Sequence, residues 1–211
     1  MRLGLFMMPL HPPARPLHDI LAEDTAKALL AERLGFHEIW VGEHFSARSE
    51  PIPSPLMFMA SLIIPRTSRL SFASGVLTLP HRHPAVIAAE IAQFDHMSQG
   101  RFLLGVGTGS LPSDFELLGT FDAARRGRMV LESIQTMRRL WTEPPPYDIQ
   151  GEHWRVTLTR TIDPALGFGT LPRCYQQPHP PIFVPAVSPH SSTLYEAGRH
   201  GWWPISSALD V

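Results

Sequence analysis

Short apolar runs alternate with longer helical patterns along the chain. β-Branched and aromatic residues gather in the short runs, and apolar residues recur at helical spacing between them, as Ile87, Ile91 and Phe94 do. This alternation is typical of βαβ units around a parallel sheet. The predicted strands are residues 2–8, 38–41, 70–79, 101–106, 182–187 and 202–206. The predicted helices are residues 17–35, 55–64, 85–97, 123–141 and 191–200, and a further short one begins near Ser113.

The composition favours one globular domain over residues 1–211. The chain has 211 residues, 44% of them hydrophobic, and a formal net charge of −1, so it can bury a large core and offers no basic stripe for nucleic acid. The single cysteine, Cys174, cannot form an internal disulfide. No apolar run is long enough to span a membrane and no export leader is visible, so we expect a cytoplasmic protein.

Residues 143–181 interrupt the βα alternation. Eleven of them are proline or glycine, which indicates a long insertion, and a hairpin across Gly151 fits the pattern there.

Candidate chemistry follows the carboxyl ends of the predicted strands, where ligands of parallel α/β sheets bind. His44 follows the second strand and can offer a neutral or cationic imidazole to a pocket near pH 7. Four hydroxyl residues lie at the start of the helix predicted at 191–200: Ser188, Ser191, Ser192 and Thr193. Their hydroxyls and the helix amides can bind a phosphate, although capping of the helix by Ser191 or Ser192 would explain the same pattern.

Glycines mark two further strand ends. Gly105, Gly107 and Gly109 lack the spacing of a dinucleotide fingerprint because Ser110 stands where its third glycine belongs. They form a tight turn and let a flat ligand approach the backbone. Gly75, inside a β-prone run, indicates a bulge, a ligand contact or a small residue in a barrel layer.

Other polar patterns point to no metal. His81 and His83 form an H-x-H pair in a proline-bounded loop that has no nearby Cys, Asp or Glu to complete a ligand set, so we expect no metal site. Three arginines of one helix could approach a phosphate or form a solvated face: Arg125, Arg126 and Arg128. An apolar pocket could be lined by Phe6, Phe45 and Phe58.

Taken together, six segments resemble the luciferase-like flavin monooxygenases in the family's order. They are residues 36–46, 73–84, 94–119, 126–134, 178–189 and 196–202. Within that family, GVGTGSLPSD (105–114) and AVSP (186–189) are most similar to the limonene 1,2-monooxygenase group. The resemblance implies a TIM (β/α)8-type barrel. Such barrels usually have about 250 residues, so we expect an incomplete one with six strands and five helices.

The resemblance also implies a cofactor and site residues. Reduced FMN, delivered by a separate NAD(P)H:flavin reductase, would react with O2 to a C4a-peroxide that oxygenates a small hydrophobic substrate. His44 matches the family's active-site histidine, and Ser74 and Gly75 match a strand bulge, often with a non-prolyl cis peptide, that supports the flavin ring. Thr108 matches a position near the ring and ribityl chain. The phosphate-binding turn matches Ser188, His190 and Ser191.

Two other functions remain open. Part of this superfamily uses the deazaflavin F420 for hydride transfer, and a shortened chain could bind flavin without catalysis. Because the first and sixth predicted strands would each present an open edge, we expect a homodimer.

Overall fold

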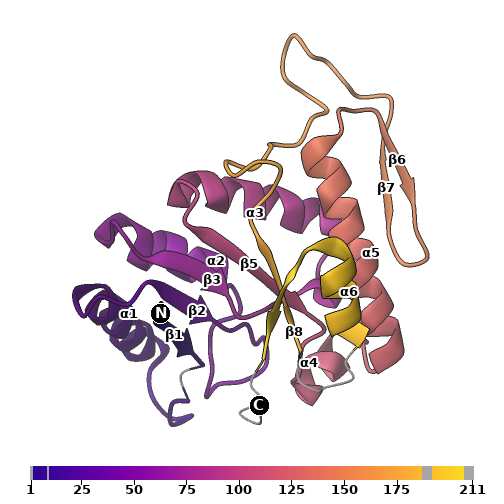
Figure 1. The fold of residues 1–211 in the computed structure, drawn as a ribbon. Coiled ribbons are helices and arrows are strands. Elements are labelled where there is room, and N and C mark those ends of the chain that lie inside the picture. Colours follow the sequence, from indigo (N-terminus) through magenta and orange to yellow (C-terminus); the bar gives the residue numbers. More distant parts are fainter. Residues whose placement is uncertain (1, 9, 187–191, 207–211) are drawn as a thin grey trace.

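In the described residues, seven parallel strands form one curled sheet (Figure 1). The computed structural model describes residues 2–8, 10–186 and 192–206. The strands lie in the order β1 (Gly4–Met7), β2 (Glu38–Val41), β3 (Ser71–Ser74), β5 (Phe102–Gly107), β8 (Ile182–Pro185) and β9 (Trp203–Ile205). The short β4 (Leu77–Thr78) also pairs with β5, in parallel. The order follows the chain, as in a (β/α) barrel, so the predicted incomplete TIM-type barrel is confirmed.

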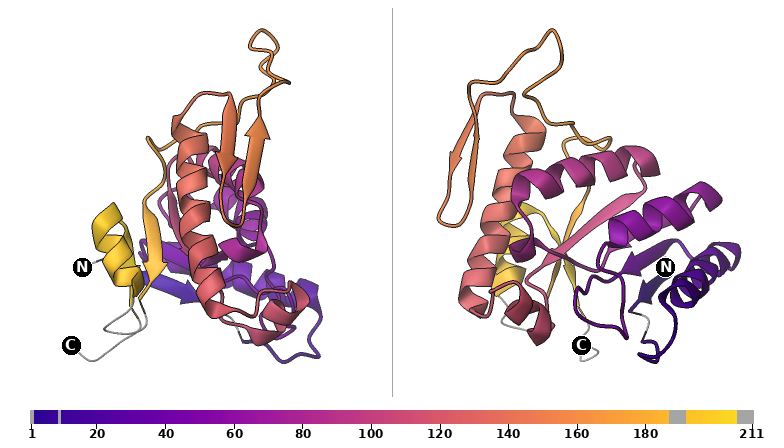
Figure 2. Two further views of the ribbon diagram at one scale, coloured as in Figure 1. Left: turned by 90° about the vertical axis from the view of Figure 1, so that its right-hand side faces the viewer. Right: turned by 180° about the vertical axis from the view of Figure 1, so that it is seen from behind.

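The longer helices fan around this sheet (Figure 2). Helices in the described residues are α1 (Leu17–Arg33), α2 (Pro55–Phe58), α3 (Pro84–Ser98), α4 (Pro112–Leu117), α5 (Ala123–Thr142) and α6 (Ser192–His200). The predicted order of strands and helices is therefore observed, with the short α4 as a sixth α-helix. None of these helices is both long and apolar enough to cross a membrane.

The main core lies between the sheet and the helices. Alternate residues of β2, Ile39 and Val41, are fully buried there, as period-2 alternation requires. The predicted faces of α3 and α5 meet them in this core, and the indole of Trp141 donates a hydrogen bond to the Ala88 carbonyl at 3.0 Å. Helix α1 ends as expected, because Gly35 adopts a φ of +85° just beyond its last turn.

The other residues of the strands build an aromatic layer. Trp40 packs edge-on against Phe183, with ring centroids 5.1 Å apart, and Phe183 stacks on Trp203 at 6.2 Å. Phe6 and Trp203 are half exposed or more, at 50% and 60%. Apolar surface therefore lies on both sides of the sheet.

Two predicted elements are broken where local chemistry prevents a regular backbone. The run 70–79 divides into β3 and β4 around a cis peptide bond between Gly75 and Val76, and a 3₁₀ turn begins at Leu79. The predicted helix 55–64 is α-helical only in α2, then forms a π-turn and a 3₁₀ turn (Ile64–Arg66). Pro65 has no N–H to continue an α-helical ladder.

The predicted hairpin across Gly151 is present. It consists of β6 (Tyr147–Gln150) and β7 (Arg155–Leu158), which pair in antiparallel fashion beside α5 (Figure 2). The Glu132 carboxylate of α5 accepts hydrogen bonds from the amides of His153 (3.1 Å) and Trp154 (2.7 Å). This carboxylate ties the hairpin turn to the helix.

Candidate active site

The loop that follows β2 places His44 between two carboxylates. Its Nε2 lies 2.9 Å from Oε2 of Glu50, and its Nδ1 lies 3.6 Å from Oδ2 of Asp114. The side chain of His44 is 11% exposed. It lines a small hollow of about 10 Å³, close to the room that one water molecule needs. The hollow is enclosed by Met7, Met8, Gly42, His44, Glu50 and Ile52.

Asp114 reaches this loop from α4, on the far side of β5. Its carboxylate accepts hydrogen bonds from the amides of Phe45 (3.1 Å) and Ser46 (2.8 Å) and from the Ser46 hydroxyl. Burial disfavours the charged carboxylate, but the bonds from Ser46 and Phe45 and the charge of His44 outweigh it and lower the pKa of Asp114. The carboxylate is therefore an ionised anchor for the loop.

Glu43, beside His44, points the other way. It is buried, and its oxygens accept from the Thr78 amide at 2.8 Å and from the Arg82 guanidinium at 2.6 Å. Burial raises the pKa of Glu43, although Arg82 and Thr78 oppose this. Glu43 thus links the end of β2 to the end of β4, while His44 faces the hollow.

Ser74 and Gly105 bring β3 and β5 into close contact. The Ser74 hydroxyl donates to the Gly105 carbonyl at 2.8 Å and accepts from the Gly105 amide at 3.0 Å. A Cβ built at Gly105 would lie 1.9 Å from the carbonyl oxygen of Ser74. The glycine is therefore required by the neighbouring strand and not by a ligand at that point, which corrects the expectation for Gly105. Ser74 is fully buried, and its hydroxyl serves the contact with Gly105.

The neighbouring strand ends carry little side-chain bulk. A Cβ at Gly75 would lie 2.9 Å from the ring of the half-exposed Phe6, and one at Gly42 would lie 3.4 Å from the Met8 side chain. Gly107 ends β5, and Thr108 follows it, half-buried. The cis bond after Gly75 lies where the resemblance implied one. The glycines at these strand ends, bordered by the Phe6 ring and the Met8 side chain, fit a flat ring system such as a flavin.

The other candidate residues lie in different surroundings. Ser188, His190 and Ser191 fall outside the described residues. Arg126 is not free for a phosphate, because its guanidinium lies 3.7 Å from the centre of the Phe115 ring and donates to two backbone carbonyls.

The structure also shows the surroundings of Phe45 and Phe58 and of the two histidines of the H-x-H pair. Phe58 is buried in the core, so the prediction that it lines a pocket was wrong. Phe45 instead packs edge-on against His81. His81 contacts the Thr120 hydroxyl at 3.0 Å, whereas His83 accepts from the Ala85 amide, so the two histidines of the H-x-H pair serve different contacts.

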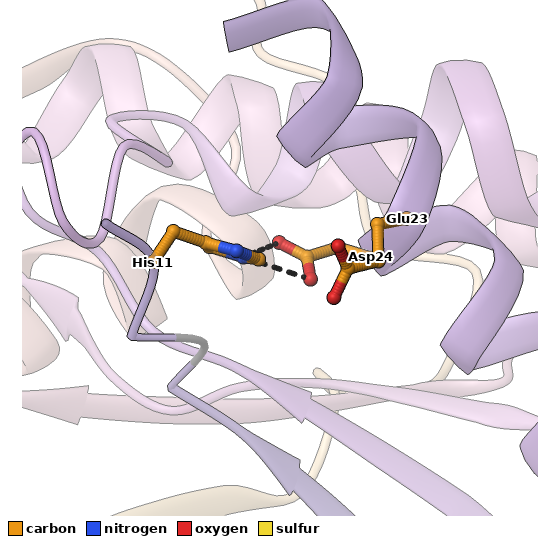
Figure 3. Close-up of side chains that lie close together, drawn as sticks. All are labelled: His11, Glu23 and Asp24. Atoms are coloured by element: carbon orange, nitrogen blue, oxygen red, sulfur yellow. Dashed lines mark hydrogen bonds and ion pairs between the residues drawn. The ribbon is translucent and has the colours of Figure 1, made fainter. Parts of the chain in front are cut away.

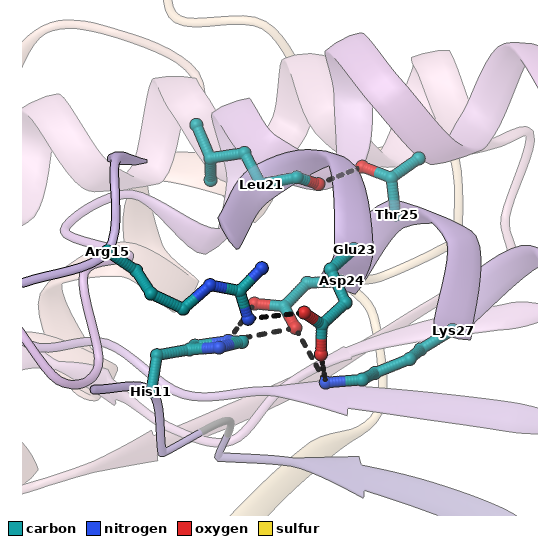
Figure 4. A network of polar contacts seen from close by, with 7 residues as sticks. All are labelled: His11, Arg15, Leu21, Glu23, Asp24, Thr25 and Lys27. Atoms are coloured by element: carbon teal, nitrogen blue, oxygen red, sulfur yellow. Dashed lines mark hydrogen bonds and ion pairs between the residues drawn. The ribbon is translucent and has the colours of Figure 1, made fainter. Parts of the chain in front are cut away.

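A second polar cluster lies at the start of α1. His11 Nε2 is 3.0 and 3.1 Å from the two carboxylate oxygens of the buried Asp24, with Glu23 beside them (Figure 3). Arg15 and Lys27 approach Glu23 to 2.5 and 2.6 Å (Figure 4). Hydrogen bonds from Lys27 and Arg15 lower the pKa of Glu23 to about 2. The two cations lie against the carboxylates of Glu23 and Asp24, so the described contacts of the cluster are those of an ion-pair network.

Two of the residues around His44 were missed from the sequence. Glu50 lies in the same loop, but nothing in the neighbouring sequence distinguishes it from other acidic residues. Asp114 is 70 positions from His44 along the chain, so spacing gives no signal for their contact. Only its place at the start of a helix after a strand could have indicated it.

Comparisons with known proteins identify relatives of this chain. The 4-hydroxyprotoasukamycin monooxygenase of Streptomyces nodosus subsp. asukaensis is 41% identical over 204 residues, which cover 96% of this chain and 52% of that protein. Limonene 1,2-monooxygenase of Rhodococcus erythropolis is 36% identical over 137 residues, 65% of this chain and 35% of that protein. The chain thus spans about half the length of the curated relatives it matches.

A solved structure shares the fold. It is a type II Baeyer–Villiger monooxygenase, the oxygenating constituent of 3,6-diketocamphane monooxygenase of Pseudomonas putida, in complex with FMN. The two chains are 26% identical with a TM-score of 0.87, over 98% of this chain and 57% of the other. The family model for luciferase-like monooxygenases matches residues 1–209. The chain therefore belongs to the luciferase-like monooxygenase family.

Proposed function

We propose that this chain is the oxygenating part of a flavin-dependent monooxygenase. It would use reduced FMN, supplied by a separate flavin reductase, and O2 to oxygenate a small hydrophobic organic substrate. The observation that carries the proposal is the position of His44. It stands at the carboxyl edge of the sheet, between two carboxylates, next to strand ends that bear little side-chain bulk.

Bound reduced FMN would supply the electrons that activate O2. The residues that would hold its ring are Gly75, with Phe6 beside it, and Thr108 after β5. For the phosphate, the family resemblance implies Ser188, His190 and Ser191. His44 would hold or move a proton at the reacting face, a role for which a histidine between carboxylates is suited.

The similarity to known proteins supports the same chemistry. The relatives named above are monooxygenases, and the solved structure with the same fold holds FMN and is one constituent of a larger enzyme. A separate reductase is the natural source of reduced flavin for such a constituent. Apolar surface near the site, including the half-exposed Phe6, favours an apolar substrate.

The test begins with cofactor binding. The purified chain is titrated without oxygen with reduced FMN and, in parallel, with reduced F420, and binding is followed by fluorescence and absorbance. Air containing ¹⁸O2 is then admitted with limonene as an apolar test substrate. We expect reduced FMN to bind and ¹⁸O to appear in the product.

Two histidine variants sharpen the test. His44→Ala should bind reduced FMN within about threefold of the parent chain but lose about 100-fold or more in product formation, the usual contribution of a general acid or base. His18→Ala is the matched control, because that histidine is 84% exposed on α1. Tight F420 binding without reaction with oxygen would favour the hydride-transfer alternative. Binding of FMN without any product would favour a non-catalytic flavin protein.

We also propose that the chain assembles as a homodimer. Within the described residues, β1 and β9 each have one neighbouring strand, and Phe6 and Trp203 expose apolar surface near them. Light scattering on the purified chain should give twice the mass of one chain. A uniform monomer that turns over flavin would refute the dimer.

A further inference from the structure

Asp114 controls the backbone on which His44 stands. The carboxylate is 3% exposed and accepts the amide hydrogens of Phe45 and Ser46, the two residues that follow His44. The Ser46 hydroxyl donates to the same carboxylate. A rotation of the loop about His44 would break these bonds, so the direction of the loop is set from α4.

The same carboxylate faces the ring of His44. The distance of 3.6 Å from Oδ2 to Nδ1 is too long for a hydrogen bond but short enough for a charge interaction in a buried place. On the other side of the ring, Glu50 lies at hydrogen-bond distance from Nε2. The nearby Glu43 is turned toward Arg82, and His81 packs against Phe45. Among the described residues, the charged groups in contact with the ring are therefore Asp114 and Glu50.

The carboxylates of Asp114 and Glu50 differ in how firmly other contacts hold them. Asp114 has three other hydrogen-bond donors, whereas His44 is the one side-chain partner that the described residues give to the carboxylate of Glu50. Glu50 can turn away when a ligand approaches Nε2, but Asp114 cannot leave Nδ1 without releasing the loop.

We propose that Asp114 is the positioning residue of His44. It holds the loop, keeps the Nδ1 side of the ring toward the protein and so leaves Nε2 as the nitrogen that meets a ligand. This inference rests on the catalytic role proposed above for His44. A buried aspartate that fixes a working imidazole acts through orientation and charge and is not itself consumed.

Two substitutions separate the two actions of Asp114. Asp114→Asn removes the charge but keeps a carbonyl oxygen that can accept from the Ser46 amide. Asp114→Ala removes both. Asp122→Asn is the matched control, because Asp122 caps α5 by accepting from the Arg125 amide at 3.0 Å and has no described contact with His44.

The first measurement is nuclear magnetic resonance of the full chain with ¹⁵N-labelled histidine, without flavin. His44→Gln identifies the signals of this ring. In Asp114→Asn, the ¹⁵N chemical shifts of the His44 ring should change, because the charge that faces Nδ1 at 3.6 Å has gone. Asp122→Asn should leave these signals unchanged.

The second measurement is steady-state turnover with reduced FMN. Asp114→Asn should lower kcat by about 10- to 100-fold and change KM for reduced FMN by less than about threefold. Asp114→Ala should lower kcat further. An unchanged ring signal in Asp114→Asn, or a kcat no lower than that of Asp122→Asn, would overturn the proposal.

The proposal can still be tested if Asp114→Asn does not fold. If Asp114→Asn does not fold, Asp114→Glu keeps the charge and displaces it, and the same split between kcat and KM is then required. Because the ring signal is read without flavin, an inactive parent chain would refute the proposed function while the ring measurement still decides the role of Asp114.

Discussion

Replacing Gly105 with alanine tests the close contact of β3 and β5. The added Cβ would lie 1.9 Å from the carbonyl oxygen of Ser74 and 3.1 Å from its carbonyl carbon. The first contact is with backbone atoms, so no flexible side chain can move aside. The strands would have to separate by more than 1 Å, estimated from an ordinary carbon–oxygen contact of about 3.3 Å.

The cost has two parts. Forcing a methyl group into a packed interior costs about 1–3 kcal/mol. Separating the strands also breaks both hydrogen bonds of the Ser74 hydroxyl with Gly105, each worth about 1 kcal/mol. The free energy of unfolding should therefore fall by about 4 kcal/mol. In a chain of this size that corresponds to a fall in Tm of about 8–16 °C.

Thermal and urea unfolding of matched variants isolate the cause. Ser74→Ala removes the hydrogen bonds without adding bulk and should cost about 2 kcal/mol. Gly127→Ala places a methyl group in α5 where no atom lies within 4 Å, and it should raise stability by about 0.5–1 kcal/mol. If Gly105→Ala unfolds within about 1 °C of the parent chain, the steric reasoning is wrong. If Ser74→Ala costs as much as Gly105→Ala, the hydrogen bonds and not the overlap dominate.

Three further changes test the polar contacts. Arg82→Gln leaves the buried Glu43 carboxylate without its cation and should cost about 3 kcal/mol in urea unfolding at pH 7. Because burial already raises the pKa of Glu43 above its usual 4.5, this loss should shrink as the pH falls from 7 toward 4.5 and the carboxyl takes up a proton. The pKa of Asp114 is lowered instead. The parent chain should therefore be more stable than Asp114→Asn at pH 7, and this difference should disappear as the pH falls below 3.8. A difference in the free energy of unfolding that does not depend on pH would contradict this. A Cβ at Gly151 would lie 1.9 Å from Oε1 of Glu132, so Gly151→Ala should displace that carboxylate and speed limited proteolysis of the hairpin at least about tenfold, whereas Gly127→Ala should not.

The sequence predicts the barrel well because its signals are local. Period-2 alternation places Ile39 and Val41 in the core, and helical spacing places Ile87 and Ile91 there. The break in the third strand is also signalled, since a glycine interrupts a β-prone run at Gly75. These patterns depend only on neighbours along the chain.

The same local reasoning fails where two distant segments meet. Gly105 belongs to a glycine run that suggests ligand contact, but the structure shows that the backbone of Ser74 fills the place of its side chain. Asp114 has no neighbour in the sequence that indicates its bond to the Ser46 amide. Tertiary contacts decide both residues, so a single sequence can nominate the region but not the role.

The loop that carries His44 is held in place by residues that are distant from it in the sequence. Loops at the carboxyl edge of a barrel are often the mobile part of the fold. Three other segments hold this loop. The His11 amide donates to the Ser49 carbonyl at 2.8 Å, and Arg82 donates to the Pro53 carbonyl at 3.2 Å. Asp114 accepts hydrogen bonds from two amides of the loop. The position of the imidazole is thus a property of the assembled sheet and not of the residues beside it. A change at any of these three contacts should therefore lower turnover through the orientation of His44, even where none of them touches a ligand.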